Sequence, residues 1–351
     1  MVGVFAGGQY FHVAIVLSGF FPHGKINWTN QQGDNLMTPQ ELLDKLETVV
    51  IGKRQQALWL LVALIAKGHV LIEDVPGVAK TRMVRSLAQL LQLSFARIQC
   101  TPDLLPSDIT GGMVYDPSKH SLEFRSGPVF HQMVLVDEIN RATPRAQSAL
   151  LESMEEGQVS VDGITYPLPQ PHLIAATANP VEMSGTFPLP EAQKDRFLLS
   201  FSMGYPTLQE EQHMAHQLSL FDPVQELTQE ITPEEIVAWQ DKAGRIRISQ
   251  PVSDYIVALV RESREHPQVV LGASPRSVMQ WIRALKAYVW LHGETFATPD
   301  HVQALVRVIL GHRLIIQGGP RQHVLYERSR VVQEILDDIV AKVAVPVENV
   351  S

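Results

Sequence analysis

The chain has 351 residues, which is long enough for two or three domains with a sizeable buried core. Its apolar content of 45% and charged content of 19% are those of an ordinary globular protein, and its net charge of −8 argues against a dedicated nucleic-acid binder without excluding a local basic track. A single cysteine, Cys100, excludes an internal disulfide and a multi-cysteine zinc site, and it is typical of a reducing compartment such as the cytoplasm.

The first 36 residues differ from the rest of the chain. Residues 2–21 contain no charged side chain, so this run approaches the length of a membrane span, but glycines interrupt it and no basic residue precedes it. We predict a poorly defined extension at 1–36; a dispensable extension, a misplaced start and an anchor all remain open. At Met37 the pattern changes, because the next four residues, 38–41, form a capping box with proline at the first helical position.

Two helices and a phosphate-binding loop are predicted next. Apolar residues at helical spacing predict one helix from 39 to about 51 and a second from 53 to 67. The apolar run 70–72 then predicts a buried strand that turns into a third helix, with Lys80 and Thr81 at the turn. In such a loop the backbone N–H groups face an anion, the lysine reaches the β- and γ-phosphates and the threonine hydroxyl binds Mg²⁺.

This loop departs from the strict phosphate-binding pattern G-x-x-x-x-G-K-[ST]. Asp74 and Ala79 occupy its two glycine positions. Taken alone, the segment is therefore also compatible with a plain strand-to-helix turn in which a lysine and a threonine follow each other by chance. The ends of two later strands help to decide between these interpretations.

Two further buried strands end in polar residues. Residues 133–136 are followed by Asp137 and Glu138, and residues 173–178 are followed by Asn179. Because the ligands of doubly wound sheets lie beyond the carboxyl ends of the strands, these side chains are expected at the edge that carries the phosphate loop. Acidic residues also favour the first turn of a helix, which is the structural alternative for the acidic pair. Three strands that deliver suitable groups to one edge favour a nucleotide site.

A short strand at 94–99 and two hairpins complete the predicted core. Residues 112–124 contain two strand segments around an Asp-Pro turn, and residues 158–166 alternate around an Asp-Gly turn. After Phe201 the strands are predicted to stop, and helices follow. We therefore divide the chain into the extension at 1–36, a nucleotide-binding core at 37–204, and a helical domain with a C-terminal tail at 205–351.

The motifs together resemble a known family. In chain order they read EDVPGVAKT (73–81), RIQCTPDLLPSDITG (97–111), VLVDEINRA (134–142), IAATANP (174–180), LPEAQKDRF (189–197) and GASPR (272–276). Their order and spacing, from Met37 to about Gly311, are similar to those of AAA+ ATPases of the MoxR type, which are related to the motor subunit of magnesium chelatase. The resemblance implies an α/β fold: an AAA+ P-loop core with a parallel five-stranded sheet and β-hairpin insertions, followed by a smaller helical lid domain.

ATP and Mg²⁺ are the cofactors that this resemblance implies. The metal is expected on Thr81 and, through water, on Asp137. In this family Asp74 and Ala79 recur at the glycine positions, so their presence does not weaken the assignment of the loop. The implied nucleotide contacts are Ile51 and Gly52 beside the adenine, and Val75, Pro76, Gly77, Val78, Ala79, Lys80, Thr81 and Arg82 in the loop.

The resemblance also implies catalytic roles. Glu138 is expected to polarise the attacking water, and Asn179 resembles the sensor amide that orients it. Arg196 resembles the arginine finger presented to a neighbouring subunit, and Arg276 resembles the second sensor at the start of a lid helix. Without the family match both arginines would be interpreted as surface ion pairs, and whether each acts within its own chain or on a neighbour stays open. Arg141, next to the acidic pair, is a weaker candidate for a subunit contact.

The implied function is that of a homo-oligomeric, hexameric ring that hydrolyses ATP to remodel or activate a protein client, often one with a von Willebrand A domain. The alternative is the motor of a metal-chelatase-like complex. A nucleic-acid motor is disfavoured because Lys119 is the only basic residue other than histidine within 112–124, and a non-enzymatic scaffold has no need of a water-activating carboxylate. No nucleic-acid or membrane partner is expected. Asp116 and Asp162 are either turn formers or contacts to the Mg²⁺ of such a client.

Overall fold

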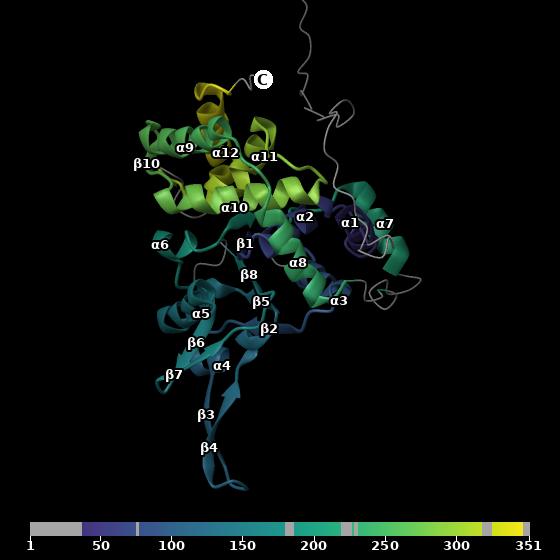
Figure 1. Cartoon of the computed structure of the whole chain (residues 1–351), viewed down its shortest axis with the longest axis vertical. Helices are drawn as coiled ribbons and strands as arrows, with labels where there is room; N and C mark the ends of the chain where they lie inside the picture. The colour runs from purple at the N-terminus through teal and green to yellow at the C-terminus, as the bar shows by residue number, and fades with distance from the viewer. Residues whose placement is uncertain are drawn as a thin grey trace, which may run out of the picture.

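The computed structural model describes residues 37–74, 77–179, 186–218, 227, 231–317 and 325–346. The predicted extension at 1–36 lies outside them. At the centre is a five-stranded parallel sheet in the order β2-β5-β8-β1-β9 (Figure 1). The strands are β1 (Val70–Glu73), β2 (Phe95–Gln99), β5 (Met133–Asp137), β8 (Leu173–Ala178) and β9 (Leu199–Phe201). Together with the helices and hairpins described below, this sheet confirms the predicted fold class.

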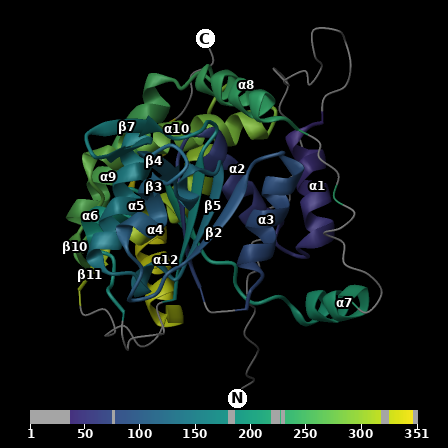
Figure 2. The same ribbon diagram turned by 90° about the horizontal axis from the view of Figure 1, so that it is seen from below.

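Each face of the sheet packs against a different set of helices. In β1, Val70 and Ile72 belong to one buried cluster, whereas Leu71 between them belongs to the other, as the alternation of side chains along a strand requires. The first cluster contains residues of α1 (Pro39–Val49), α2 (Arg54–Ile65) and α3 (Lys80–Leu90). The second contains residues of α4 (Pro106–Thr110) and α5 (Pro144–Glu156). Figure 2 shows α1 and α3 on one side of the sheet and α4 and α5 on the other.

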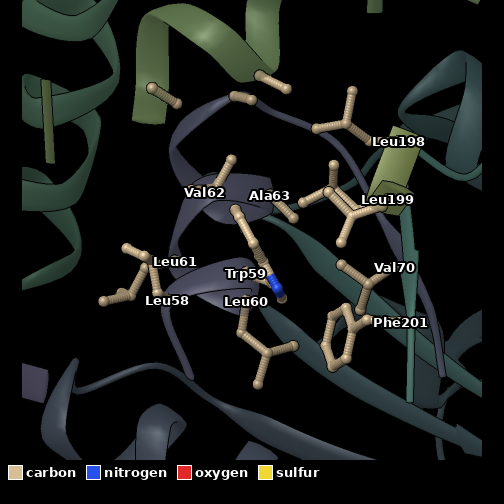
Figure 3. Packing of buried hydrophobic residues seen from close by; sticks show 14 of the residues in the cluster. Leu58, Trp59, Leu60, Leu61, Val62, Ala63, Val70, Leu198, Leu199 and Phe201 are labelled. Carbon is tan, nitrogen blue, oxygen red and sulfur yellow. The ribbon is translucent and has the colours of Figure 1, made fainter. Parts of the chain in front are cut away.

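The first two helices illustrate two ways in which sequence sets burial. Helix α1 begins with the predicted capping box, in which Thr38 and Glu41 exchange hydrogen bonds, and it buries one apolar face. Helix α2 is apolar all round, so it must be covered on every side. It packs against α1, α8 and α10 and against β9. Figure 3 shows Trp59 and Leu60 on the side of this helix that faces Val70 and Phe201 of the sheet.

Both predicted hairpins are confirmed. The first pairs β3 (Gly111–Asp116) with β4 (Ser121–Ser126) and projects from the body of the molecule (Figure 1). The second pairs β6 (Gln158–Val161) with β7 (Ile164–Pro167). At the base of the first hairpin, Gly111 has a φ of +81° and lies so close to Arg125 and Gly127 that a Cβ would collide with their backbone. The rings of Phe124 and Tyr166 stack at 4.0 Å and hold the two hairpins together.

The rest of the described chain is mostly helical. Its helices are α6 (Glu191–Lys194), α7 (Leu208–Leu218), α8 (Pro233–Gly244), α9 (Gln250–Glu265), α10 (Pro275–Leu291), α11 (Pro299–Leu310) and α12 (Leu325–Lys342). The larger buried cluster continues from α1 and α2 into these helices through Trp239, Trp281 and Trp290. A division of the chain at residue 204 therefore stays a prediction, because apolar packing is continuous across it.

One prediction about this region is wrong. We expected the strands to stop after Phe201, but β10 (Val269–Leu271) pairs antiparallel with β11 (Ile315–Ile316). These strands have three and two residues, which is too short for an alternating pattern to be visible in the sequence. The pair joins the end of α9 to the segment after α11, so it is created by tertiary packing rather than by local propensity.

Candidate active site

The phosphate loop lies between β1 and α3, as predicted. Lys80 is the first residue of α3, and its Nζ donates to the carbonyl oxygen of Asp74 at 3.3 Å. Gly77 has a φ of +86°, is exposed, and has no atom within 4 Å of the position that a Cβ would take. This open backbone, followed by the N-terminus of an 11-residue helix, suits a phosphate group. Val75 and Pro76 lie outside the described residues.

The two residues that replace the loop glycines have separate physical explanations. Ala79 adopts the left-handed conformation with a φ of +61°, which glycine adopts freely and which costs alanine about 1 kcal/mol. Asp74 is buried, and its carboxylate accepts hydrogen bonds from the Ser202 hydroxyl and the Gly204 N–H, both at 2.9 Å. Asp74 therefore ties the loop to the segment that follows β9. The sequence did not predict these contacts, because Ser202 and Gly204 lie 128 and 130 residues away from Asp74 in the chain.

A pocket of about 600 Å³, including its open mouth, adjoins the loop. Its apolar lining suits a nucleotide base, and it occurs where α1, the loop and the segment before α7 meet. The lining residues are Val49, Val50, Ile51, Lys53, Gly77, Val78, Ala79, Arg82, Gly204, Pro206 and Met214. Of the predicted contacts, Ile51, Gly77, Val78, Ala79 and Arg82 line it, whereas Gly52 packs beside Glu210 so closely that a Cβ would meet the carboxylate. The sequence did not predict that Lys53, Pro206 and Met214 also line the pocket.

The acidic pair follows β5 at the same edge of the sheet. Asp137 is buried and accepts hydrogen bonds from Arg97 Nε at 2.6 Å and from the Thr177 hydroxyl at 3.2 Å. The same Thr177 oxygen accepts the N–H of Glu138 at 2.9 Å. Glu138 has a φ of +58°, an uncommon conformation for a residue with a side chain. Thr177, on the neighbouring strand β8, thus positions both members of the pair.

The Glu138 carboxylate is held by two further side chains. Its Oε2 accepts from Gln99 Nε2 and from an Arg141 guanidinium nitrogen, each at 3.0 Å. Gln99 ends β2, which pairs with β5 in register. The contact between Arg141 and Glu138 lies within one chain, and a subunit contact of Arg141 stays a prediction. Neither Gln99 nor Arg97 was predicted, although their position at the end of a strand beside β5 is the signal that points to them.

The loop lysine is electrostatically linked to the carboxylates at the strand ends. Burial lowers the pKa of the Lys80 amine, while the negative charges of Asp74, Asp137 and Glu138 act in the opposite direction. These groups therefore lie within electrostatic reach of one another, as the predicted common edge requires. Thr81 directly follows Lys80 in the first turn of α3.

Asn179 follows β8 at this edge and is buried. Its carbonyl oxygen accepts from Asn140 Nδ2 at 3.0 Å, so the segment after β5 holds the backbone of this residue. The strand before it pairs with both β1 and β5, and the Asp74 N–H donates to Ala178 oxygen at 3.1 Å. Asn179 therefore lies between the strand of the phosphate loop and the strand of the acidic pair.

The two predicted arginines lie elsewhere. Arg196 Nε and an Arg276 guanidinium nitrogen both pair with Glu155, at 2.8 and 2.6 Å. Glu155 is close to the end of α5, which starts beyond the carboxyl end of β5 and returns along the sheet. The carbonyl oxygen of the preceding residue, Met154, pairs with His69 Nε2 at 3.1 Å, and His69 directly precedes β1. Lys80, Asp137, Glu138 and Asn179 thus lie together where the parallel strands end, which we call the carboxyl edge. Both arginines lie where these strands begin, which we call the amino edge.

Comparisons with known proteins agree with this geometry. Residues 69–199 match the model of the ATPase family associated with various cellular activities (AAA), and residues 261–339 match the AAA lid domain. The chain is 37% identical over 288 residues to a protein of Mycobacterium tuberculosis named Chaperone MoxR1, covering 80% of this chain and 76% of that one. This chain belongs to the MoxR-type AAA+ ATPases. The predicted resemblance is therefore confirmed.

Two further relatives extend the match. An uncharacterized Bacillus subtilis protein, YeaC, is 43% identical over 307 residues, which is 88% of this chain and 94% of that one. The crystal structure of a presumed ATPase from Cytophaga hutchinsonii superposes with a TM-score of 0.79 at 34% identity, covering 88% of this chain and 94% of that chain. The likeness of this MoxR-type ATPase to its relatives thus includes both the sheet and the lid helices.

As a MoxR-type AAA+ ATPase the chain is an enzyme that hydrolyses ATP, and its residues fit the nucleotide with Mg²⁺. Thr81, and Asp137 through a bound water, would supply oxygen donors of the kind that Mg²⁺ prefers, which suits an ion that otherwise binds water and substrate phosphates. Within the described ranges, no cluster of three histidine, cysteine or acidic side chains forms a separate metal site. In the same ranges, no helix combines the length and the apolar character needed to cross a bilayer.

Proposed function

We propose that this MoxR-type ATPase works as a ring of six identical subunits that hydrolyses ATP to remodel or activate a protein client. The observation that carries the proposal is the position of Arg196 relative to Lys80. Arg196 lies just before β9, and the neighbouring Leu198 N–H donates to the carbonyl oxygen of His69 at 2.8 Å, at the start of β1. Lys80 follows the opposite end of β1. An arginine at the amino edge cannot reach the phosphates held by its own chain, so it serves a second copy.

Within one subunit, the side chains at the carboxyl edge take separate roles. Lys80 neutralises the terminal phosphates, and Thr81 and Asp137 hold Mg²⁺, which screens the charge that develops on them. Glu138 orients and deprotonates the attacking water, and Asn179 positions that water. Gln99 and Arg141 both donate to Oε2 of Glu138, so the lone pairs of Oε1 remain for the attacking water and its proton.

Mixing two inactive variants tests the assembly. Arg196→Ala has an intact pocket and a missing finger, whereas Lys80→Ala has a missing pocket and an intact finger. A mixed ring contains some interfaces in which a good pocket meets a good finger, so ATPase activity should reappear when the two are combined. Native mass spectrometry should verify that mixed rings of six form. No recovery of activity at any ratio in verified mixed rings would contradict action across the interface.

The projecting hairpin is proposed to contact the client, for which the best candidate is a protein with a von Willebrand A domain. Its side chains Val114, Tyr115 and Leu122 are between 49% and 61% exposed, which is unusual for apolar residues in a strand pair. Asp116 accepts hydrogen bonds from the N–H and hydroxyl of Ser118, at 2.8 and 2.7 Å, which supports a turn-forming role. Tyr115 and Leu122 pair across the two strands, so we place the contact on these two side chains rather than on Asp116.

The client contact is tested with a von Willebrand A domain protein that Glu138→Gln rings retain in the presence of ATP. Purified, this protein should stimulate the wild-type ATPase. Leu122→Ser should keep the basal ATPase rate and lose the stimulation, because the hairpin is remote from the site, while Asp116→Asn and Asp162→Asn should behave as wild type. Full stimulation of Leu122→Ser would place the contact elsewhere. Loss of stimulation in either asparagine variant would restore the carboxylate contact.

The proposal also includes the domain boundaries and the cellular location. Residues 37–204 are taken as the nucleotide-binding core and residues 205–351 as the lid with its tail. The proposed location is the cytoplasm, supported by the buried, unpaired Cys100, whose thiol pKa burial raises to about 12. Such a thiol is protonated and inert at neutral pH, as is common for a structural cysteine in a reducing compartment.

A further inference from the structure

A single carboxylate joins the two arginines at the amino edge. Glu155 Oε2 pairs with Arg196 Nε at 2.8 Å, and Glu155 Oε1 pairs with Arg276 at 2.6 Å. The three side chains keep 33%, 31% and 44% of their surface exposed, respectively. Hydrogen bonds from Arg276 and then from Arg196 lower the pKa of the Glu155 carboxyl, so it is ionised at neutral pH. Two cations and one anion leave a net positive charge, which is suited to a phosphate group.

A polar cluster of Asp195, Ser274 and Arg313, called the buried joint below, holds the two backbone segments that carry these arginines. Asp195, next to Arg196, accepts from the Ser274 hydroxyl at 2.8 Å and from Arg313 Nε at 2.8 Å. Ser274 is the N-cap of α10, two residues before Arg276. Burial lowers the pKa of the Arg313 guanidinium to about 10, and Asp195 opposes this effect, so the pair stays ionic. The loop of Arg196 and the start of α10 are therefore held together independently of Glu155.

The position of Glu155 places this pair away from its own nucleotide. With a rise of about 1.5 Å per residue, α5 carries Glu155 about 16 Å from its first residue, Pro144, which follows the acidic pair. Helix α5 also covers the face of the sheet opposite to α3, whose N-terminus is Lys80 (Figure 2). As far as the described residues show, the lining of the pocket includes no residue of α5 or α10.

We propose that Glu155 is a positioning residue that presents Arg196 and Arg276 as one cationic pair to the nucleotide of a second copy of this chain. The inference rests on the proposed ring, and it adds that Arg276 acts on the neighbour's nucleotide rather than on its own. Without Glu155 the two guanidinium groups repel each other and lose the bridge that orients both. Their partly exposed side chains remain accessible to an incoming subunit. Met279, one turn further along α10 and 62% exposed, adds an apolar contact beside them.

Substitution of Glu155 separates a positioning role from a structural one. Glu155→Gln should lower kcat roughly 10- to 100-fold, the scale of effect when catalytic groups are misplaced, and leave the KM for ATP unchanged because the subunit's own pocket is intact. Glu156→Gln is the matched control on the same helix, since Glu156 forms no ion pair among the described residues, and it should keep the wild-type kcat. An unchanged kcat in Glu155→Gln would overturn the proposal. A large rise in KM would too, since it would place Glu155 at its own pocket.

A double-mutant cycle asks whether Glu155 acts through the arginines. In an Arg276→Ala background, Glu155→Gln should cost much less than it does in the wild type, because part of what it positions is already gone. Multiplicative losses of activity, with no coupling between the two changes, would show that Glu155 has an unrelated role and would overturn the proposal. Thermal unfolding of each variant shows whether the subunit stays folded at the assay temperature.

Mixed rings distinguish failure of this inference from failure of the proposed function. Arg276→Ala combined with Lys80→Ala should recover activity, as should Glu155→Gln combined with Lys80→Ala. If Arg276 acts on its own nucleotide, the Arg276→Ala mixture recovers nothing while the Arg196→Ala mixture does; that result overturns the inference and leaves the ring proposal intact. If no mixture recovers activity, the proposed action across the interface fails, and the inference fails with it.

Discussion

The two edges of the central sheet carry different parts of the predicted site. At the carboxyl edge, Asp137, Glu138 and Asn179 lie directly at strand ends. Hydrogen bonds to Thr177 and Asn140 hold them in place. At the amino edge, Arg196 and Arg276 are long side chains mounted on a loop and on a lid helix. The difference is that the sheet itself holds the groups at the carboxyl edge, whereas the arginines depend on contacts between the core and the lid, through Glu155 and through Asp195 with Ser274 and Arg313.

The largest expected loss of activity comes from a substitution at the carboxyl edge. Glu138→Gln keeps the shape of the side chain and removes the base, so ATP hydrolysis should fall by about 10²- to 10⁴-fold while ATP binding persists. Steady-state phosphate release and equilibrium binding of a fluorescent ATP analogue measure the two quantities. Glu152→Gln, an exposed residue of α5, is the control. A wild-type turnover rate in Glu138→Gln would assign the base to another residue.

Removal of one partner of the buried joint at the amino edge should cost stability. Arg313→Met leaves the partly exposed Asp195 without its cation and leaves the oxygens of Phe197 and Gln280 without their buried donor, so the free energy of unfolding should fall by about 3–5 kcal/mol. Gln240→Met on α8 is the matched control, because its amide reaches across to the carbonyl oxygen of Leu64 without carrying a charge, and it should cost about 1–3 kcal/mol. Urea unfolding monitored by circular dichroism compares them, and equal losses would show that the joint is not an ionic anchor.

Lys80→Ala tests the binding function of the carboxyl edge. The phosphates lose their cation, so the binding free energy of ATP should weaken by about 2–5 kcal/mol. Isothermal titration calorimetry measures the affinity. Arg85→Ala, an exposed position one turn further along α3, should bind as wild type and serves as the control. If Lys80→Ala retains wild-type affinity, the loop does not hold the phosphates as argued.

The smallest expected effect concerns pH and the amino edge. Burial lowers the pKa of His69 to about 3 and that of His172 to about 4, and the two rings lie 5.9 Å apart. The unfolded chain binds protons at these residues near pH 6.5, whereas the folded chain does not, so stability is complete above pH 6.5 and falls as the pH drops toward 4. Between pH 7 and pH 5 the loss should be about 2 kcal/mol for each histidine.

His172→Leu sharpens this pH prediction. It removes one of the two histidines, so the decrease in unfolding free energy between pH 7 and pH 5 should shrink by roughly half. Urea unfolding at both pH values gives the comparison. ATP affinity at the carboxyl edge should not change with this substitution. An unaltered pH dependence would mean that other groups, and not these buried rings, bind the protons on unfolding.

The local parts of the site were predictable because their signals lie within one short stretch. Strand, turn and helix around Lys80 follow from an apolar run, a glycine and helical spacing, and the acidic pair follows from the end of another apolar run. Their common edge follows from the rule for parallel sheets, which needs no knowledge of individual contacts.

The contacts that set the rest of the site join residues far apart in the chain. Arg276 and Glu155 are 121 positions apart, Asp74 and Gly204 are 130 apart, and β10 meets β11 across a complete pair of helices. Local periodicity carries no information about such pairs, because they form only once the lid has packed on α2 and α5 has covered its face of the sheet. The sequence by itself determined the nucleotide-binding edge, whose elements are local. Only the tertiary structure decided where the arginines lie, because the packing of distant segments places them at the opposite edge.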